Sequence, residues 1–126
     1  MTQQKMFNLE QSPLLTDLYE LTMLQTYYEH GMTGESVFEL FMRQTPNRHF
    51  FVAAGMQTAV DWLVNLQFKP QELDWMKQTG LFSQAFIDQM ATFRFTGDMN
   101  AIAEGEIAFP EEPLIQIIAP LPEAQF

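Results

Sequence analysis

The spacing of apolar residues changes at Phe95, and this change constrains the fold more than any other feature of the sequence. Before Phe95, most apolar residues recur every three or four positions, which predicts amphipathic helices. Between residues 95 and 119 that period is absent, and glycines and prolines divide the chain into short apolar segments, which predicts three or four strands. Helices that mostly precede strands indicate an α+β fold with a small, mostly antiparallel sheet.

The first helix is expected to begin at Thr16 or Asp17 and to end at Gly31. Asp17 and Glu20 have the spacing of a capping box, and a glycine is the common residue just past a helix end. The expected core face of this helix is the stripe formed by Leu18, Leu21, Leu24 and Tyr28. Tyr19 lies off that stripe.

Three more helices are expected further along the chain. Residues 56–66 have helical period, and Pro70 suits the first position of a helix over residues 71–78 that Gly80 ends. Ser83 is placed to cap the last helix. In the first of these helices the side chains expected to face inward are Met56, Val60, Trp62 and Leu63. In the last, Phe86, Met90 and Phe93 lie one turn apart.

Two strands are expected between the first and second helices, over residues 36–43 and 50–53, with a turn at 46–48. In the first strand Phe38, Leu40 and Met42 alternate onto one face, and Glu39 and Arg43 share the other. Residues 1–13 are expected to form a polar tail. Residues 14–126 are expected to form a single domain that stops at the start of a helix.

The charge of the chain excludes one class of partner. Sixteen acidic residues against six basic ones give a formal net charge of -10, and the six basic residues are dispersed. Because nucleic-acid binding depends on neutralising phosphates with lysine and arginine, no nucleic-acid partner is expected. No apolar run reaches the roughly 20 residues that span a membrane. With no cysteine and no signal core, a cytoplasmic protein is expected.

The residues alone do not identify a catalytic site. The chain has no phosphate-binding glycine loop, and His30 and His49 stand in unrelated contexts. Four glutamates between residues 104 and 112 lie in expected turns, where solvated loop charges are a better interpretation than a magnesium site. No metal site is expected in this segment.

A series of short motifs resembles one enzyme family. The run from Leu14 to Met23, Leu-Leu-Thr-Asp-Leu-Tyr-Glu-Leu-Thr-Met, is similar to the opening signature of nicotinate phosphoribosyltransferases. Further motifs follow in the family's order: Phe38 to Arg43, Pro46 with Phe51 to Gly55, Phe93 to Asp98, Glu104-Gly105, Phe109-Pro110, Glu112 to Leu114 and Ala119 to Leu121. The resemblance covers nearly all of this chain and the first quarter to third of the family's length.

The resemblance implies the N-terminal α/β domain of a type II phosphoribosyltransferase, without the barrel domain. Such enzymes join nicotinate to 5-phosphoribosyl 1-diphosphate, with ATP hydrolysis and Mg²⁺, to give nicotinate mononucleotide and pyrophosphate for NAD salvage. The implied assembly is a homodimer in which the N-terminal helix of one subunit closes the pyridine pocket of the other. Because the phosphoribosyl loop and phosphohistidine belong to the barrel, no catalytic residue and no bound cofactor are expected in this segment. The chain alone is expected to be inactive.

Three substrate-binding residues are implied by the same resemblance. Tyr19 matches a tyrosine that stacks on the pyridine ring, and Asp17 matches an acidic residue near the ring edge. Arg43 resembles a phosphate-contacting arginine, and its planar guanidinium suits a phosphate better than a lysine would. Each has a structural alternative: a core or interface aromatic for Tyr19, a helix cap for Asp17, and pairing with Glu39 for Arg43.

Other functions remain open from the sequence. Residues 103–118 resemble the hairpins of biotinyl and lipoyl carrier domains, but none of the lysines lies within that segment. A non-catalytic domain that pairs with a separate barrel subunit is a second alternative. The sister nicotinamide phosphoribosyltransferase is a third, although the unbroken Asp-Leu-Tyr-Glu-Leu-Thr-Met run favours the nicotinate branch.

Overall fold

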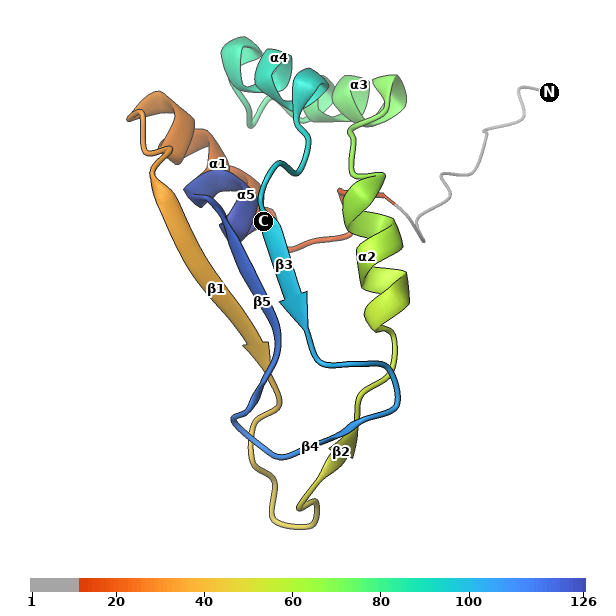
Figure 1. Cartoon of the computed structure of the whole chain (residues 1–126). Helices are drawn as coiled ribbons and strands as arrows, with labels where there is room; N and C mark the ends of the chain where they lie inside the picture. Colours follow the sequence, from red (N-terminus) through yellow and green to blue (C-terminus); the bar gives the residue numbers. More distant parts are fainter. Residues whose placement is uncertain (1–11) are drawn as a thin grey trace, which may run out of the picture.

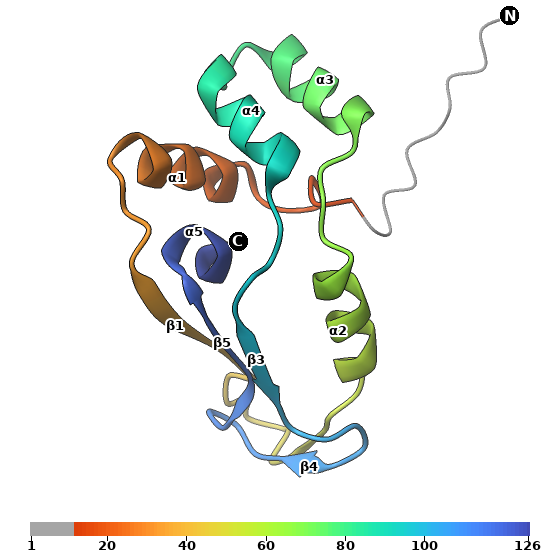
Figure 2. The same ribbon diagram turned by 45° about the horizontal axis from the view of Figure 1, so that its top comes forward.

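A computed structural model describes residues 12–126, and it has the expected α+β architecture (Figure 1). The elements, in chain order, are α1 (Leu18–Glu29), β1 (Glu35–Phe41), β2 (Phe51–Val52), α2 (Met56–Val64), α3 (Pro70–Thr79), α4 (Gln84–Thr92), β3 (Asp98–Ala101), β4 (Ile107–Ala108), β5 (Pro113–Pro120) and α5 (Leu121–Gln125). Helices α1, α3 and α4 gather at one end, and the strands extend away from them (Figure 2). Within the described residues, no helix is long and apolar enough to cross a membrane.

The main sheet is antiparallel, with β5 between β1 and β3. Ile117 of β5 is paired with Phe38 on one side and with Met99 on the other. A separate ladder joins β2 to β4 at the far end of the molecule (Figure 1). Three strands, β3, β4 and β5, follow Phe95, which confirms the prediction of three or four strands there. The expected strand over residues 50–53 is shorter, because its partner β4 offers only two residues for pairing.

The core of the molecule is built by the helices and their connections. Its buried members are Leu21, Leu24, Leu66, Phe68, Met76, Phe82, Phe86, Ile87, Met90 and Phe93. Ser83 caps α4 as predicted, because its hydroxyl oxygen accepts a hydrogen bond from the backbone N–H of Phe86 at 3.2 Å. Pro70 opens α3 and Gly80 ends it in the left-handed conformation, also as predicted.

Leu18 does not belong to this core, contrary to the sequence prediction, and is 51% exposed. Successive steps of three residues fall about 60° short of a full helical turn, so Leu18 is rotated about 120° from Leu24 around the axis. Around the helix axis the half-buried Tyr28 and the buried Leu21 lie about 40° and about 60° from Leu24, both on the side toward Leu18. Leu18 lies further around, outside the buried face.

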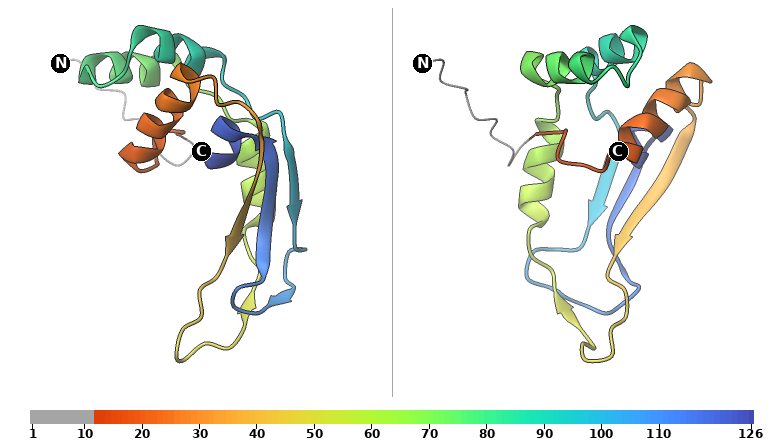
Figure 3. Two further views of the ribbon diagram at one scale, coloured as in Figure 1. Left: turned by 90° about the vertical axis from the view of Figure 1, so that its left-hand side faces the viewer. Right: turned by 180° about the vertical axis from the view of Figure 1, so that it is seen from behind.

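The sheet contributes no side chain to this core. The residues predicted to form the apolar face of the strand at 36–43 are largely exposed, with Phe38 at 37%, Leu40 at 54% and Met42 at 38%. Helices α1 and α5 lie on one face of the sheet, and the described residues place no helix on the other face (Figure 3). Helix α2 has no fully buried residue, and Val60, expected to face inward, is 37% exposed. The sheet and α2 are therefore left largely without cover.

A buried hydrogen bond anchors the segment that leads into α1. The Ser12 hydroxyl donates to a carboxylate oxygen of Glu72 at 2.5 Å, and these residues are only 3% and 1% exposed. The other Glu72 oxygen accepts from the backbone N–H of Lys69 at 2.6 Å. The Ser12 oxygen also accepts from the backbone N–H of Leu14 at 3.1 Å. This contact fixes the residues just before α1 to the start of α3.

Candidate functional site

The first turn of α1 carries two of the expected substrate-binding residues. Asp17 occupies the N-cap position with extended backbone angles, but its side chain makes no capping hydrogen bond. The predicted capping box is therefore wrong, because the Glu20 carboxylate accepts a hydrogen bond from the Gln125 side chain at 2.5 Å instead. Asp17 is exposed, and capping does not account for its carboxylate.

Tyr19 points away from the core and is 56% exposed. Met23, one turn further along α1, is 36% exposed, and Leu15, in the bend before α1, is 69% exposed. A hydrogen bond to Glu20, and then the negative charges of Glu20 and Asp17, raise the pKa of the Tyr19 phenol. The ring is therefore neutral at physiological pH and available for contact with a molecule outside the described residues. Tyr19 is therefore not part of the core formed within residues 12–126.

Arg43 lies two residues beyond the end of β1 and is exposed. Glu39 was its alternative partner, but the Glu39 carboxylate accepts a hydrogen bond from the Gln116 side chain at 2.9 Å. Strand β1 starts near the end of α1 and runs toward the β2–β4 ladder (Figure 1). At about 3.3 Å per residue, the strand carries Arg43 more than 20 Å from its own start. Within residues 12–126, Arg43 is therefore not brought together with Asp17 and Tyr19.

Glu104 has a structural role that the sequence analysis missed. It was interpreted as a solvated loop charge, but its carboxylate accepts hydrogen bonds from the backbone N–H groups of Gly55, Met56 and Gln57 at 2.6, 2.8 and 3.2 Å. These bonds, led by that from Gly55, lower the pKa of Glu104. The signal available in the sequence was Gly55, because a glycine at the N-cap has no side chain with which to cap α2.

The position of Glu104 also limits where a substrate phosphate can bind. The start of a helix attracts anions through its unpaired N–H groups and the helix dipole. At α2 these N–H groups already bind the Glu104 carboxylate. A phosphate group would have to displace that carboxylate, so the start of α2 is not a phosphate site.

The described residues do not fit a metal ion. Among residues 12–126, no group of three or more histidine, aspartate or glutamate side chains could hold one. Arg94 donates hydrogen bonds to the Phe93 carbonyl and to the Gln67 side chain.

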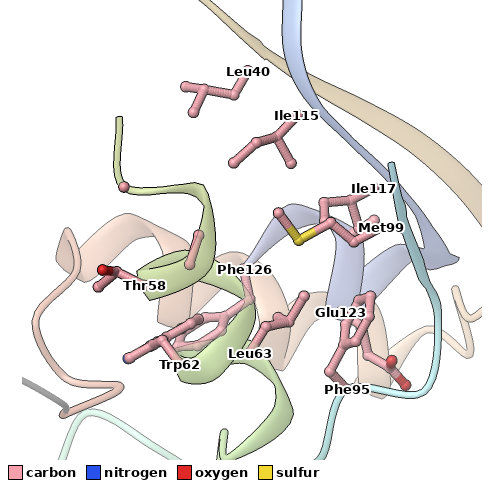
Figure 4. Close-up of a pocket in the computed structure, with 13 residues that line it drawn as sticks. Leu40, Thr58, Trp62, Leu63, Phe95, Met99, Ile115, Ile117, Glu123 and Phe126 are labelled. Carbon is pink, nitrogen blue, oxygen red and sulfur yellow. The ribbon is translucent and has the colours of Figure 1, made fainter. Parts of the chain in front are cut away.

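A groove of about 560 Å³ separates α2 from the main sheet (Figure 4). On the sheet side its walls are Leu40, Met99, Ile115 and Ile117, and on the helix side they are Gly55, Thr58, Ala59, Trp62 and Leu63. Phe95, Glu123, Ala124 and Phe126 complete the lining. The Phe126 ring stacks beside Trp62, with centroids 6.4 Å apart. The groove is a cleft with an almost entirely apolar surface.

A smaller hollow of about 210 Å³ lies among Tyr28, Gln89, Thr92, Phe93, Arg94, Thr96 and Glu123. Its charged side chains already have partners, because Glu123 accepts hydrogen bonds from Thr96 and Arg94 donates to Gln67. Burial, and then the charge of Glu123, raise the pKa of Tyr28. No unpartnered charge is present there to hold an ionic substrate.

Comparison with known proteins connects this geometry to one enzyme family. The family described as the nicotinate phosphoribosyltransferase (NAPRTase) N-terminal domain matches residues 14–126. Nicotinate phosphoribosyltransferase pncB2 of Mycobacterium tuberculosis is 45% identical over 113 residues, which are 89% of this chain and 24% of that protein. The Bacillus subtilis nicotinate phosphoribosyltransferase is 34% identical over 114 residues, 89% of this chain and 23% of that enzyme.

Solved structures agree with these matches. The crystal structure of human nicotinic acid phosphoribosyltransferase superposes with a TM-score of 0.75 at 30% identity, over 87% of this chain and 23% of that one. The enzyme from Porphyromonas gingivalis shares the fold, with a TM-score of 0.57 at 16% identity, over 90% of this chain and 29% of that one. The chain thus spans about a quarter of the length of the curated relatives it matches.

Proposed function

Because the chain belongs to the nicotinate phosphoribosyltransferase family, we propose that it supplies the N-terminal part of an enzyme that joins nicotinate to 5-phosphoribosyl 1-diphosphate. The products would be nicotinate mononucleotide and pyrophosphate, in an ATP-dependent step of NAD salvage. The observation that carries the proposal is the family match over residues 14–126, which includes α1 with its exposed Tyr19. The proposal includes ATP and Mg²⁺, because the family resemblance implies both for the complete enzyme.

In the proposed reaction, the pyridine nitrogen attacks the anomeric carbon of the ribose while pyrophosphate leaves. Positive charge develops on the ribose ring and negative charge on the leaving group, so positioning and electrostatics carry most of the catalysis. Tyr19 would hold the pyridine ring flat, and its neutral phenol is suited to stacking. Asp17 would lie near the ring edge, and Arg43 would contact a phosphate group of the donor.

The separation of Arg43 from α1 is compatible with a homodimer whose active sites are shared. If α1 of one subunit closes the pyridine pocket of the other, Tyr19 and Arg43 of the same chain serve opposite active sites. They would then have no need to lie close together within one chain. The exposed apolar side chains of Tyr19 and Met23, one turn apart on α1, support this arrangement, because such a surface favours contact with another subunit.

The test replaces Tyr19 with alanine in a full-length chimera, in which residues 14–126 take the place of the matching region of the Mycobacterium tuberculosis relative. We expect KM for nicotinate to rise by about tenfold, because an aromatic contact with the substrate ring is lost. Leu18→Ala is the matched control, since Leu18 is the preceding residue and is 51% exposed. An unchanged KM in Tyr19→Ala, or an equal rise in Leu18→Ala, would contradict the stacking role.

A second control separates binding from stability. Leu21 lies one turn from Leu18 and is only 3% exposed. Leu21→Ala should lower the free energy of unfolding by about 2–5 kcal/mol through loss of buried contacts. If Tyr19→Ala lowered the melting temperature as much as Leu21→Ala, Tyr19 would be a structural residue.

A further inference from the structure

Helix α5 holds α1 through the side chain of one residue, Gln125. Its amide nitrogen donates a hydrogen bond to the Glu20 carboxylate at 2.5 Å, and its amide oxygen accepts one from the Tyr27 phenol at 3.2 Å. Glu20 and Tyr27 are seven residues apart, which is almost two turns, so they lie on the same side of α1. Both polar groups of the amide are therefore bonded to one flank of α1, beside which α5 lies (Figure 2).

This flank lies between the buried face of α1 and Tyr19. At about 100° per residue, Glu20 and Tyr27 are about 40° and about 60° from the buried Leu24 around the helix axis. Tyr19 lies further in the same direction, about 140° from Leu24. The hydrogen bonds with Gln125 therefore hold α1 on the side from which Tyr19 projects.

These hydrogen bonds can fix the rotation of α1 more closely than its apolar contacts can. Burial of Leu21 and Leu24 is favourable over a range of rotations, because the hydrophobic effect has no preferred direction. A hydrogen bond weakens when its donor, hydrogen and acceptor leave a nearly straight line. A rotation of α1 by about 10° would move a side chain about 6 Å from the helix axis by about 1 Å. A misplacement of about 1 Å in an active site can cost about 100-fold in rate.

Gln125 is a fixed support because α5 is itself attached to the sheet. Strand β5 runs directly into α5, and the backbone N–H of Leu121 donates a hydrogen bond to the Gly34 carbonyl at 2.8 Å. The Glu123 carboxylate accepts hydrogen bonds from the backbone N–H and hydroxyl groups of Thr96 at 2.6 and 3.0 Å, just before β3. The sheet therefore determines where the Gln125 side chain lies.

We propose that Glu20 and Gln125 are positioning residues, which together hold α1 at the rotation that presents the Tyr19 ring to the pyridine ring of nicotinate. The inference rests on the proposed function, in which Tyr19 stacks on that ring. The Glu20 carboxylate also interacts with the Tyr19 phenol, through a hydrogen bond and its negative charge, so it restrains the ring as well as the helix. Both residues act through Tyr19, and neither can contribute more to nicotinate binding than Tyr19 itself does.

The experiment measures KM for both substrates in the full-length chimera that carries Gln125→Ala. We expect KM for nicotinate to rise by about three- to tenfold, and no more than in Tyr19→Ala. KM for 5-phosphoribosyl 1-diphosphate should change by less than about twofold, because the donor does not contact the Tyr19 ring. An unchanged KM for nicotinate, or an equal rise in both constants, overturns the proposal.

Substitutions of Glu20 test the other partner of the same hydrogen bond. Glu20→Ala should raise KM for nicotinate as Gln125→Ala does, whereas Glu20→Gln should restore it, because the new amide oxygen still accepts from Gln125. Glu29→Ala is the matched control, since Glu29 is the exposed last residue of α1 and its loss removes the same charge. Equal effects of Glu20→Ala and Glu29→Ala overturn the proposal.

A double-mutant cycle separates positioning from stability. In a Tyr19→Ala background, Gln125→Ala should change KM for nicotinate by less than about twofold, because the ring that Gln125 positions is absent. A loss of stability would instead lower the melting temperature in both backgrounds. A further rise of KM for nicotinate in the double variant overturns the proposal.

Tyr27→Phe decides the question if Gln125→Ala and Glu20→Ala lose their helical circular dichroism. It removes only the hydroxyl that donates to Gln125, and it should raise KM for nicotinate about threefold; an unchanged KM overturns the proposal. If Tyr19→Ala leaves KM for nicotinate unchanged, the stacking role in the proposed function fails and the positioning role fails with it. If Tyr19→Ala raises that KM but Gln125→Ala, Glu20→Ala and Tyr27→Phe do not, the positioning role alone is wrong.

Discussion

Gly97 is the glycine whose replacement the structure penalises most directly. It precedes β3, where the chain passes close to the central strand β5. A Cβ atom at Gly97 would lie 2.4 Å from both the Ala119 Cβ and the Ile118 carbonyl oxygen, and 2.9 Å from the Ala119 Cα. Carbon atoms pack at about 3.5–4.0 Å, so the two segments would have to separate by about 1 Å. Two of these three atoms belong to the backbone of β5 and cannot rotate away.

We therefore expect Gly97→Ala to lower the free energy of unfolding by about 1–3 kcal/mol, the usual cost of overpacking. At roughly 4 °C per kcal/mol for a chain of this size, the melting temperature should fall by about 4–12 °C. Gly34→Ala is the matched control, because a Cβ at Gly34 meets no atom within 4 Å and its φ is not positive. That variant should be neutral, or more stable by up to about 1 kcal/mol. The assay is urea unfolding monitored by circular dichroism, and equal midpoints for the two variants would refute the reasoning.

Three further predictions concern single side chains. Ser12→Ala should lower the free energy of unfolding by about 1–3 kcal/mol, because it leaves the buried Glu72 carboxylate without its hydroxyl donor. An unchanged urea midpoint in this variant would contradict the prediction. The Glu104 carboxylate stabilises the fold at pH values above its ordinary pKa, and this contribution is lost as the pH falls through the lowered pKa of the folded state. Glu104→Gln should therefore be less stable than the native chain at pH 7, and the difference in stability should disappear at acid pH. A difference in stability that does not depend on pH would contradict the capping role. In the chimera, Arg43→Lys keeps the charge but loses the planar fork, so KM for 5-phosphoribosyl 1-diphosphate should rise, and an unchanged KM would remove Arg43 from the donor site.

The features that the sequence predicted correctly depend on local chemistry. Ser83 caps a helix with its hydroxyl, Pro70 starts one with its fixed ring, and Gly80 ends one because its backbone is free to turn. These helix ends were therefore predictable from the local sequence. Phe86, Met90 and Phe93 were recognised as lying one turn apart, and all three are buried. The change of pattern at residue 95 likewise located the strand-forming part of the chain.

The features that the sequence missed depend on contacts between distant residues. Glu104 accepts hydrogen bonds at the start of α2 from residues 47 to 49 positions earlier in the chain. The buried Glu72 accepts a hydrogen bond from Ser12, 60 positions earlier. The alternating pattern of β1 indicated a strand with one apolar face, but it could not show that the described chain leaves Leu40 uncovered. For the candidate site, the pattern placed Tyr19 off the core stripe, whereas its proposed role came from the family resemblance alone.

The order of the strands in the main sheet has a consequence during synthesis. Among residues 12–126, strand β1 pairs only with β5, so Glu35 is joined to Pro120 across most of the chain. A ribosome completes α2, α3 and α4 before it makes Pro113, and those helices can begin to pack while β1 still has no partner. During that interval β1 is an unpaired apolar edge, which is the kind of surface that binds other nascent chains. A chain that stops before β5 keeps this edge permanently, so truncation between α4 and Pro113 would produce an aggregating species rather than a smaller soluble domain.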